Sequence, residues 1–224
     1  MTETSGATSA SYVQPSGRVF RWAFAYDLLL NIIWRGSERT YREKTLEHAG
    51  LRTGEAVLDV GCGTGTLAIA AKRRVGPAGR VFGLDASREM ISRARKKATG
   101  ARAEIVFQVA GAEALPFSDA TFDVVLSTTV FHCLPNHTRD LCIREMVRVL
   151  KPNGRLLLID FGGSKRERHS LIGHLHAHRN FDVFDLIPTI NESGLTDQRN
   201  GSLGFSDLQF LIATRSGSTS LQSG

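Results

Sequence analysis

The chain has 224 residues, of which 42% are hydrophobic and 22% are charged. This length suits one domain with a continuous core, and the composition excludes a disordered or fibrous protein. The formal net charge is +6, but basic residues stand beside acidic ones, as in 165–168. We therefore expect solvated helix faces and no nucleic-acid partner.

The N-terminal part combines a polar tail with an apolar segment. Residues 1–17 are rich in Ser, Thr and Gly and lack the features of a signal peptide, so we expect a loose tail. The apolar run over 22–34 has thirteen residues, fewer than the roughly 20 that span a bilayer, so no transmembrane segment is expected. Helices over 18–50 are predicted to form a lid, with Trp22 and Tyr26 in a substrate pocket. Packing on a sheet, a homodimer contact or loose membrane association are the alternatives.

Strand-like and helix-like segments alternate after this lid. Short apolar runs predict five strands, which favours an α/β fold with a mainly parallel sheet covered by helices on both faces. Ser87 is predicted to cap a helix that continues to about Ala98, and a later helix is predicted to stop at Pro152. A helix over 182–193 and a late strand over 204–214 complete the pattern. The five predicted strands cover residues 56–60, 80–84, 104–109, 122–127 and 155–161.

We predict a single domain over 18–215 between two tails, 1–17 and 216–224. Within it, 18–50 forms the lid, 51–162 the cofactor-binding core and 163–215 the substrate side. The three cysteines, Cys62, Cys133 and Cys142, are widely spaced and form neither a disulfide framework nor a C-x-x-C metal motif. This cysteine usage predicts a cytoplasmic protein.

The sharpest motif is the segment 57–65, VLDVGCGTG, in which a strand ends in an acidic residue and a G-x-G-x-G loop precedes a helix. Glycines are needed where the backbone turns sharply against a ligand, and the helix that follows presents free amides to it. Asp85 ends the next predicted strand, 20 residues beyond Gly65, where its carboxylate can accept hydrogen bonds from a ribose. These two features by themselves also suit a dinucleotide.

Further sequence blocks decide whether the chain is a dinucleotide-binding protein or belongs to another class. The chain resembles the class I S-adenosylmethionine-dependent methyltransferases, in particular the small-molecule group that includes the ubiquinone and menaquinone biosynthesis enzymes. Besides the loop, the resemblance rests on 83–87 (GLDAS), 111–117 (GAEALPF), 122–125 (FDVV) and 148–154 (RVLKPNG), in that order. It implies a Rossmann-like, seven-stranded, mostly parallel sheet with an N-terminal helical lid, S-adenosylmethionine as cofactor and a small-molecule methyl acceptor.

The resemblance also implies which residues hold the cofactor. The glycines lie against its methionine and ribose parts, Asp59 near the methionine ammonium and Asp85 on the ribose. Cys62 lies inside the loop as a small packing residue. Other positions border the adenine or the methionine end. The implied set is Asp59, Gly61, Cys62, Gly63, Gly65, Asp85, Ala86, Met90, Gly111, Ala112, Glu113, Ser127 and Thr128.

Two departures from the family pattern bear on function. Gly111 stands where the family commonly has an aspartate that bonds the adenine, so Glu113 or a backbone carbonyl must substitute for it. The chain also lacks the tyrosine-containing signatures of the quinone enzymes between the fifth and sixth strands, which makes a quinone substrate one option among several.

His132 is the candidate catalytic base or substrate contact, because it follows the fourth strand by a few residues at the edge that carries the glycine loop. Phe131 and Asp160 are assigned to the substrate pocket, although a solvent-facing strand end is an equal alternative for Asp160. His174, His176 and His178 have no carboxylate or cysteine at ligand spacing, so no metal is expected.

Three functions follow from these assignments. The first is methyl transfer to an oxygen, nitrogen or carbon atom of a small, apolar or aromatic molecule. The second is methylation of RNA or protein, which the charge favours but the absence of a nucleic-acid module and of an Asn/Asp-Pro-Pro-Tyr motif disfavours. The third is a non-catalytic S-adenosylmethionine-binding subunit, suggested by Gly111 and the uncertain base.

Overall fold

The computed structural model describes residues 38–162, 181–205 and 207–217. The chain divides into two compact units, Met1–Thr40 and Tyr41–Gly224, and the sheet lies in the second. The predictions for the tails, the apolar run over 22–34, Trp22, Tyr26 and the three histidines His174, His176 and His178 lie outside the described residues.

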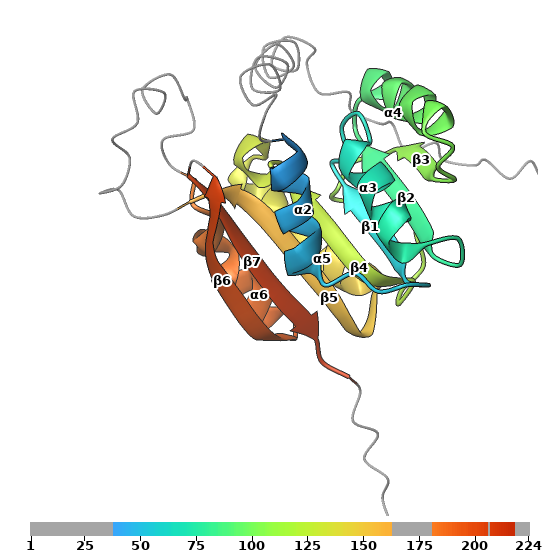
Figure 1. The fold of residues 1–224 in the computed structure, drawn as a ribbon. Helices are drawn as coiled ribbons and strands as arrows, with labels where there is room; N and C mark the ends of the chain where they lie inside the picture. The colour runs from blue at the N-terminus through green and yellow to red at the C-terminus, as the bar shows by residue number, and fades with distance from the viewer. Residues whose placement is uncertain (1–37, 163–180, 206, 218–224) are drawn as a thin grey trace, which may run out of the picture. The chain divides into compact units, whose positions relative to one another are not determined.

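The centre of this unit is a seven-stranded sheet in the order β3-β2-β1-β4-β5-β7-β6 (Figure 1). The pairs formed among β1 to β5 are all parallel, whereas β7 runs antiparallel to both β5 and β6. This arrangement confirms the predicted seven-stranded, mostly parallel sheet. The strands are β1 (Ala56–Val60), β2 (Arg80–Asp85), β3 (Val106–Val109), β4 (Phe122–Thr128), β5 (Leu150–Phe161), β6 (Leu195–Phe205) and β7 (Leu208–Arg215).

Helices cover both faces of the sheet, with α2 and α3 on one face and α5 and α6 on the other (Figure 1). Ser87 caps α4 as predicted, because its hydroxyl accepts a hydrogen bond from the Met90 amide at 3.3 Å. The helices described are α2 (Glu38–Ala49), α3 (Thr66–Val75), α4 (Arg88–Gly100), α5 (Asn136–Val149) and α6 (Ile187–Glu192), with short 3₁₀ turns η1 (Phe131–Cys133) and η2 (Val183–Leu186).

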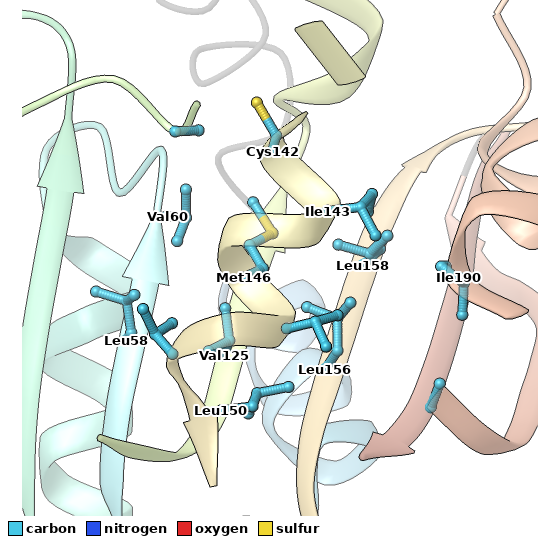
Figure 2. Packing of buried hydrophobic residues seen from close by; sticks show 14 of the residues in the cluster. Leu58, Val60, Val125, Cys142, Ile143, Met146, Leu150, Leu156, Leu158 and Ile190 are labelled. Carbon is cyan, nitrogen blue, oxygen red and sulfur yellow. The ribbon is translucent and has the colours of Figure 1, made fainter. Parts of the chain in front are cut away.

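Helix α5 supplies one side of the hydrophobic core. Cys142, Ile143 and Met146 are fully buried, and Figure 2 shows Ile143 and Met146 facing apolar side chains of β1, β4 and β5. Leu58 lies on β1 and Leu156 on β5, so this helix spans three strands. Full burial of each large side chain contributes about 1.5–3 kcal/mol to folding, so this contact fixes the strand ends that carry the site.

Three predicted boundaries were wrong. The helix expected to reach Pro152 ends at Val149, and Leu150 already begins β5. The helix expected over 182–193 is split into η2 and α6. The single late strand expected over 204–214 is two strands, because the largely exposed β6 lacks the apolar alternation that would reveal it and pairs through its backbone.

No helix in the parts of the chain that the structure describes is long and apolar enough to cross a membrane.

Candidate functional site

The glycine loop joins β1 to α3 at the carboxyl ends of the parallel strands. Gly61, Gly63 and Gly65 have φ values of 73°, 52° and 74°, which are left-handed conformations that only glycine adopts at little cost. The amides of Gly61 and Cys62 donate to the Leu84 carbonyl at 2.7 and 2.9 Å. These bonds fix the loop over the end of β2, at the point where the strand order reverses between β1 and β4.

Two of the glycines differ in what surrounds them. A Cβ added to Gly61 would lie 2.2 Å from Cγ2 of Val130, so the loop packs directly on the segment after β4. A Cβ added to Gly63 would meet no atom within 4 Å. The backbone at Gly63 therefore borders open space, which suits close approach of a ligand.

Asp85 is joined directly to the loop. One oxygen of its carboxylate accepts from the Gly63 amide at 2.9 Å, and the other accepts from the Ser87 amide at 2.8 Å. Burial raises the pKa of this carboxyl group, and the two amide bonds oppose that change. The loop and the carboxylate at the end of β2 thus lie side by side, as the resemblance implies.

Asp59 and Ser127 place unpartnered polar atoms beside the loop. Asp59 is 1% exposed, and its Oδ2 has no hydrogen-bond partner among the residues that the structure describes. Burial, reinforced by the charge of Asp85, raises the pKa of Asp59 to about 7. Ser127 is opposite Val60 in the β1–β4 register, and its buried hydroxyl is also unpartnered within that part of the chain. A buried acceptor without a donor costs about 1–3 kcal/mol, so these atoms fit a cationic ligand group with N–H donors.

The residues expected around the adenine lie just after β2, in the first turn of α4 and in the segment that follows β3. Ala86 is exposed, Met90 is half-buried and Ala112 is 8% exposed. The carboxylate oxygens of Glu113 lie 2.3 and 2.4 Å from the position that a Cβ on Gly111 would occupy. The Glu113 carboxylate therefore lies where an aspartate side chain at position 111 would begin.

The segment after β4 turns sharply at Thr129. Thr128 is the last residue of β4, and Thr129 has a φ of 56°, a strained conformation for a β-branched residue. The Thr129 amide donates to the Ile159 carbonyl at 2.7 Å, which ties the turn to β5. This bend directs Val130 onto the glycine loop and carries the chain on to His132.

His132 forms a buried pair with Asp160. Its Nδ1 lies 2.8 Å from Oδ1 of Asp160, and both side chains are almost fully buried. The Asp160 carboxylate also accepts from the backbone amides of Phe131, His132 and Phe161, at 2.8, 3.3 and 2.8 Å. The ring of Phe161 meets the imidazole edge-on at 4.8 Å. One carboxylate on β5 thus fixes the orientation of the histidine on η1.

The protonation of His132 follows from this pairing. Burial by itself lowers the pKa of the imidazole, but the hydrogen bond and charge of Asp160, together with the side chain of Cys133, outweigh burial and raise it to about 10. His132 is accordingly an imidazolium at neutral pH. It is suited to donate a hydrogen bond or to stabilise a negative charge.

The structure changes the expectations for two neighbours of His132. Phe131 was expected in a pocket wall, but it is 1% exposed and belongs to the hydrophobic core, since an aromatic ring on η1 gains more from packing under the sheet edge. Asp160 is also 1% exposed, so the alternative that its side chain faces the solvent was wrong.

Cys62, in the glycine loop, is 8% exposed, and burial raises the pKa of its thiol, which agrees with a packing residue.

Sequence reasoning missed Tyr41. Its hydroxyl oxygen is buried and has no hydrogen-bond partner in the described chain, and the charges of Asp160 and Asp59 act on it. Its signal in the sequence is that Tyr41 is the single Phe, Trp or Tyr in the mostly charged and polar segment 38–49 before β1. That signal was overlooked in favour of the more apolar segment before it.

A second charged cluster lies away from the glycine loop. A hollow of about 300 Å³ contains Arg144, Arg148 and Arg215. The guanidinium of Arg148 bonds Glu145 and Asp119, and that of Arg215 bonds backbone carbonyls at the end of α5. These arginines lie at the amino end of β5, opposite the glycine loop. In the part of the chain that the structure describes, His, Cys, Asp and Glu side chains form no group able to hold a metal ion.

The fold and the loop together define the class of protein. A doubly wound sheet with a glycine loop at its switch point, an acidic residue ending β2 and a strand order closed by an antiparallel β7 is the class I methyltransferase architecture. The sequence model of the methyltransferase domain matches residues 57–154. The chain belongs to the class I S-adenosylmethionine-dependent methyltransferases, as the sequence resemblance predicted.

Individual relatives refine this placement. The chain is 35% identical over 173 residues to the ubiquinone/menaquinone biosynthesis C-methyltransferase UbiE of Saccharophagus degradans, covering 76% of this chain and 66% of that protein. It is 42% identical over 142 residues to UbiE of Pseudomonas putida, covering 62% and 54%. The chain thus spans between about half and two thirds of the length of these relatives. A SAM-dependent methyltransferase from Aquifex aeolicus has the same fold, with a TM-score of 0.63, 24% identity and coverage of 77% of this chain and 88% of that one.

Proposed function

We propose that the protein transfers the methyl group of S-adenosylmethionine to a small, oxygen-bearing aromatic molecule. The observation that carries this proposal is the contact between the Gly63 amide and the Asp85 carboxylate at 2.9 Å, beside the unpartnered atoms of Asp59 and Ser127. These groups meet at the switch point of the sheet, where ligands of such folds bind. The proposed cofactor contacts are the thirteen residues that the resemblance implies.

The donor set fits the parts of this cofactor. Asp85 presents a carboxylate for two ribose hydroxyls, and the open backbone at Gly63 allows close approach. Asp59 and Ser127 offer acceptors for an α-ammonium. We assign Glu113 to the adenine amino group, because its carboxylate occupies the place of the family's usual aspartate.

When bound, the cofactor supplies an electrophilic methyl group on a sulfonium, so the protein must chiefly align the acceptor and exclude water. We propose that His132 acts on the acceptor side of the site. With Asp160 bound to Nδ1, the imidazolium stabilises a negatively charged acceptor oxygen instead of removing its proton. Asp160 is a positioning residue, since its carboxylate acts through His132.

The names of the UbiE relatives suggest C-methylation of a quinol-type ring as the first reaction to test. In such a reaction a new carbon–carbon bond forms to the ring while the bond from the methyl carbon to sulfur breaks, and sulfur retains the electron pair. The ring carbon then loses its proton to water. A ring hydroxyl that has released its proton to water and lies as an oxyanion beside His132 would raise the electron density at the attacked carbon.

The experiment is incubation of the full chain with methyl-labelled S-adenosylmethionine and naphthohydroquinone, benzohydroquinone and metabolite extracts, followed by mass spectrometry. A labelled methyl group on an aromatic product is the expected result. Calorimetry with S-adenosylmethionine and S-adenosylhomocysteine tests the cofactor site separately. Binding of neither compound would refute the methyltransferase function altogether.

We further propose that the protein acts on this small acceptor and not on a nucleic acid, and that it is cytoplasmic. We also propose that it forms a homodimer through its apolar N-terminal segment. Light scattering tests the assembly state. Retention on RNA that weakens with salt would instead favour an RNA substrate.

A further inference from the structure

Tyr41 lies on a firmly anchored helix. The guanidinium of Arg155 on β5 donates to the carbonyls of Ala49 and Gly50 at the end of α2, both at 3.0 Å. His48 stacks on Phe210 of β7 with ring centroids 3.9 Å apart. Helix α2 is therefore held against the β5–β7 part of the sheet.

The side chain of Tyr41 is fixed in turn. Its ring meets that of Phe205 on β6 edge-on at 6.2 Å, an arrangement typical of stabilising aromatic pairs. Lys44, one turn along α2, donates to the Leu203 carbonyl at 3.1 Å and lies 4.9 Å from the centroid of the Phe205 ring. The hydroxyl is thereby held in one place.

The surroundings of this hydroxyl are polar but leave it unsatisfied. Its oxygen is buried, and although the side chains of Thr128 and Thr45 lie beside it, neither completes a hydrogen bond within the described residues. Burial, with the charges of Asp160 and Asp59, raises the pKa of Tyr41 to about 12. The group is a protonated phenol at neutral pH and can donate a hydrogen bond.

The position of Tyr41 indicates whether its hydroxyl contacts the cofactor or the methyl acceptor. Most of the proposed cofactor contacts lie at or just after the ends of β1, β2 and β3, and Ser127 and Thr128 lie at the end of β4. Tyr41 lies beside Thr128, the last of these contacts, and near Asp160 at the end of β5, with Phe205 of β6 behind it. Its hydroxyl is on the side of the site that holds the His132–Asp160 pair.

We propose that the Tyr41 hydroxyl is a specificity-determining contact that donates a hydrogen bond to a hydroxyl or carbonyl oxygen of the methyl acceptor. This inference rests on the proposed function. A buried hydroxyl without a partner costs about 1–3 kcal/mol, and an acceptor oxygen in this place removes that cost when it binds. A ring that carries two oxygens offers one to His132 and one to Tyr41, which makes a hydroquinone the natural probe.

The test compares the wild type with Tyr41→Phe, which removes the hydroxyl and keeps the ring. With naphthohydroquinone as the acceptor, KM should rise about tenfold, because the lost bond is one neutral hydrogen bond. The affinity for S-adenosylhomocysteine should stay within about twofold of the wild type by the same free-energy scale. The matched control is Thr99→Val, since the Thr99 hydroxyl bonds the Arg95 carbonyl within α4, away from this part of the sheet. An unchanged KM in Tyr41→Phe, or a loss of cofactor affinity instead, overturns the proposal.

A measurement without any ligand keeps the proposal testable if no hydroquinone is methylated. Removing an unpaired buried hydroxyl is neutral or stabilising, whereas removing a paired one is destabilising. The melting temperature of ligand-free Tyr41→Phe should therefore equal or exceed that of the wild type. A clear decrease would mean that the hydroxyl has a structural partner, and the proposal fails. If the wild type binds the cofactor but methylates no hydroquinone, the proposal that the acceptor is a quinol is refuted instead.

Discussion

The cofactor half and the acceptor half of the site are built differently. At the ends of β1 and β2, Asp85 is joined to Gly63 and Ser87 by hydrogen bonds between residues at most 22 positions apart. At the ends of β4 and β5, His132 depends on Asp160, which is 28 positions away, and the Tyr41 hydroxyl has no partner in the described chain. The contacts that shape the cofactor half join successive segments of the chain, β1 with its loop and β2, although Asp59 and Ser127 keep unpartnered atoms there. The acceptor half brings together α2, η1 and β5, which lie farther apart in the chain, and leaves the Tyr41 hydroxyl for its ligand to satisfy.

The largest expected effect comes from breaking the acceptor half at Asp160→Ala. This change leaves the His132 imidazole and several backbone amides buried without their acceptor, so it should lower the free energy of unfolding by about 3–5 kcal/mol in urea titrations. The pKa of His132 is raised from 6.5 to about 10 in the folded protein, so the stabilisation is full below pH 6.5 and is lost as the pH rises through about 10.

The matched control for Asp160 is Glu89→Gln, which breaks an exposed ion pair with Arg93 and should cost about 0.5 kcal/mol or less. Equal stability losses in the two variants would show that the His132–Asp160 pair does not hold the acceptor half together.

The second largest effect is expected from a substitution that disrupts the cofactor half alone. Asp85→Ala removes the acceptor of the Gly63 and Ser87 amides and of the expected ribose hydroxyls, so the dissociation constant of S-adenosylhomocysteine should rise about 100-fold, which corresponds to about 2.7 kcal/mol. Calorimetric titration measures this change, with Glu89→Gln again as the control. Unchanged affinity would remove Asp85 from the cofactor site.

A change of pH sharpens the comparison, because burial moves the pKa of Asp59 in the cofactor half close to neutrality. Asp59 has a pKa of about 7 in the ligand-free protein, and an adjacent ammonium would lower it, so binding should release a proton. S-adenosylmethionine should therefore bind about tenfold more tightly at pH 8 than at pH 6, since each pKa unit corresponds to about 1.4 kcal/mol. Asp59→Asn should abolish this dependence, and a dependence that persists in that variant would assign it to another group.

The smallest effect concerns the adenine edge. Glu113→Ala should weaken cofactor binding about fivefold, the value of one hydrogen bond of about 1 kcal/mol. Because the Glu113 carboxylate lies where a side chain at position 111 would begin, Gly111→Asp combined with Glu113→Ala should restore the affinity. Gly111→Asp alone should not, since the two carboxylates would occupy the same space. Full affinity in Glu113→Ala would point to a backbone carbonyl in place of this carboxylate.

Features formed by neighbouring residues could be predicted from the sequence, whereas contacts between distant strands could not. The strands β1 and β2, the glycine loop after β1 and the Ser87 cap follow from residues close together in the chain, and these features were predicted correctly. Nothing local relates His132 to Asp160, because their contact requires the parallel pairing of β4 with β5. The role of Asp160 was missed for that reason. Tyr41 was missed because its environment comes from α2, β4, β5 and β6 together, whereas apolar composition directed attention to Trp22 and Tyr26.

The position of β7 has a consequence for biosynthesis. This strand is the last of the seven in the chain, yet it lies between β5 and β6. During translation, the apolar edge of β5, which includes Leu156 and Leu158, therefore has no neighbour until residues 208–215 have left the ribosome. An unpaired apolar strand edge is prone to aggregate, so the nascent chain depends on prompt completion of its C-terminal hairpin or on protection by a chaperone.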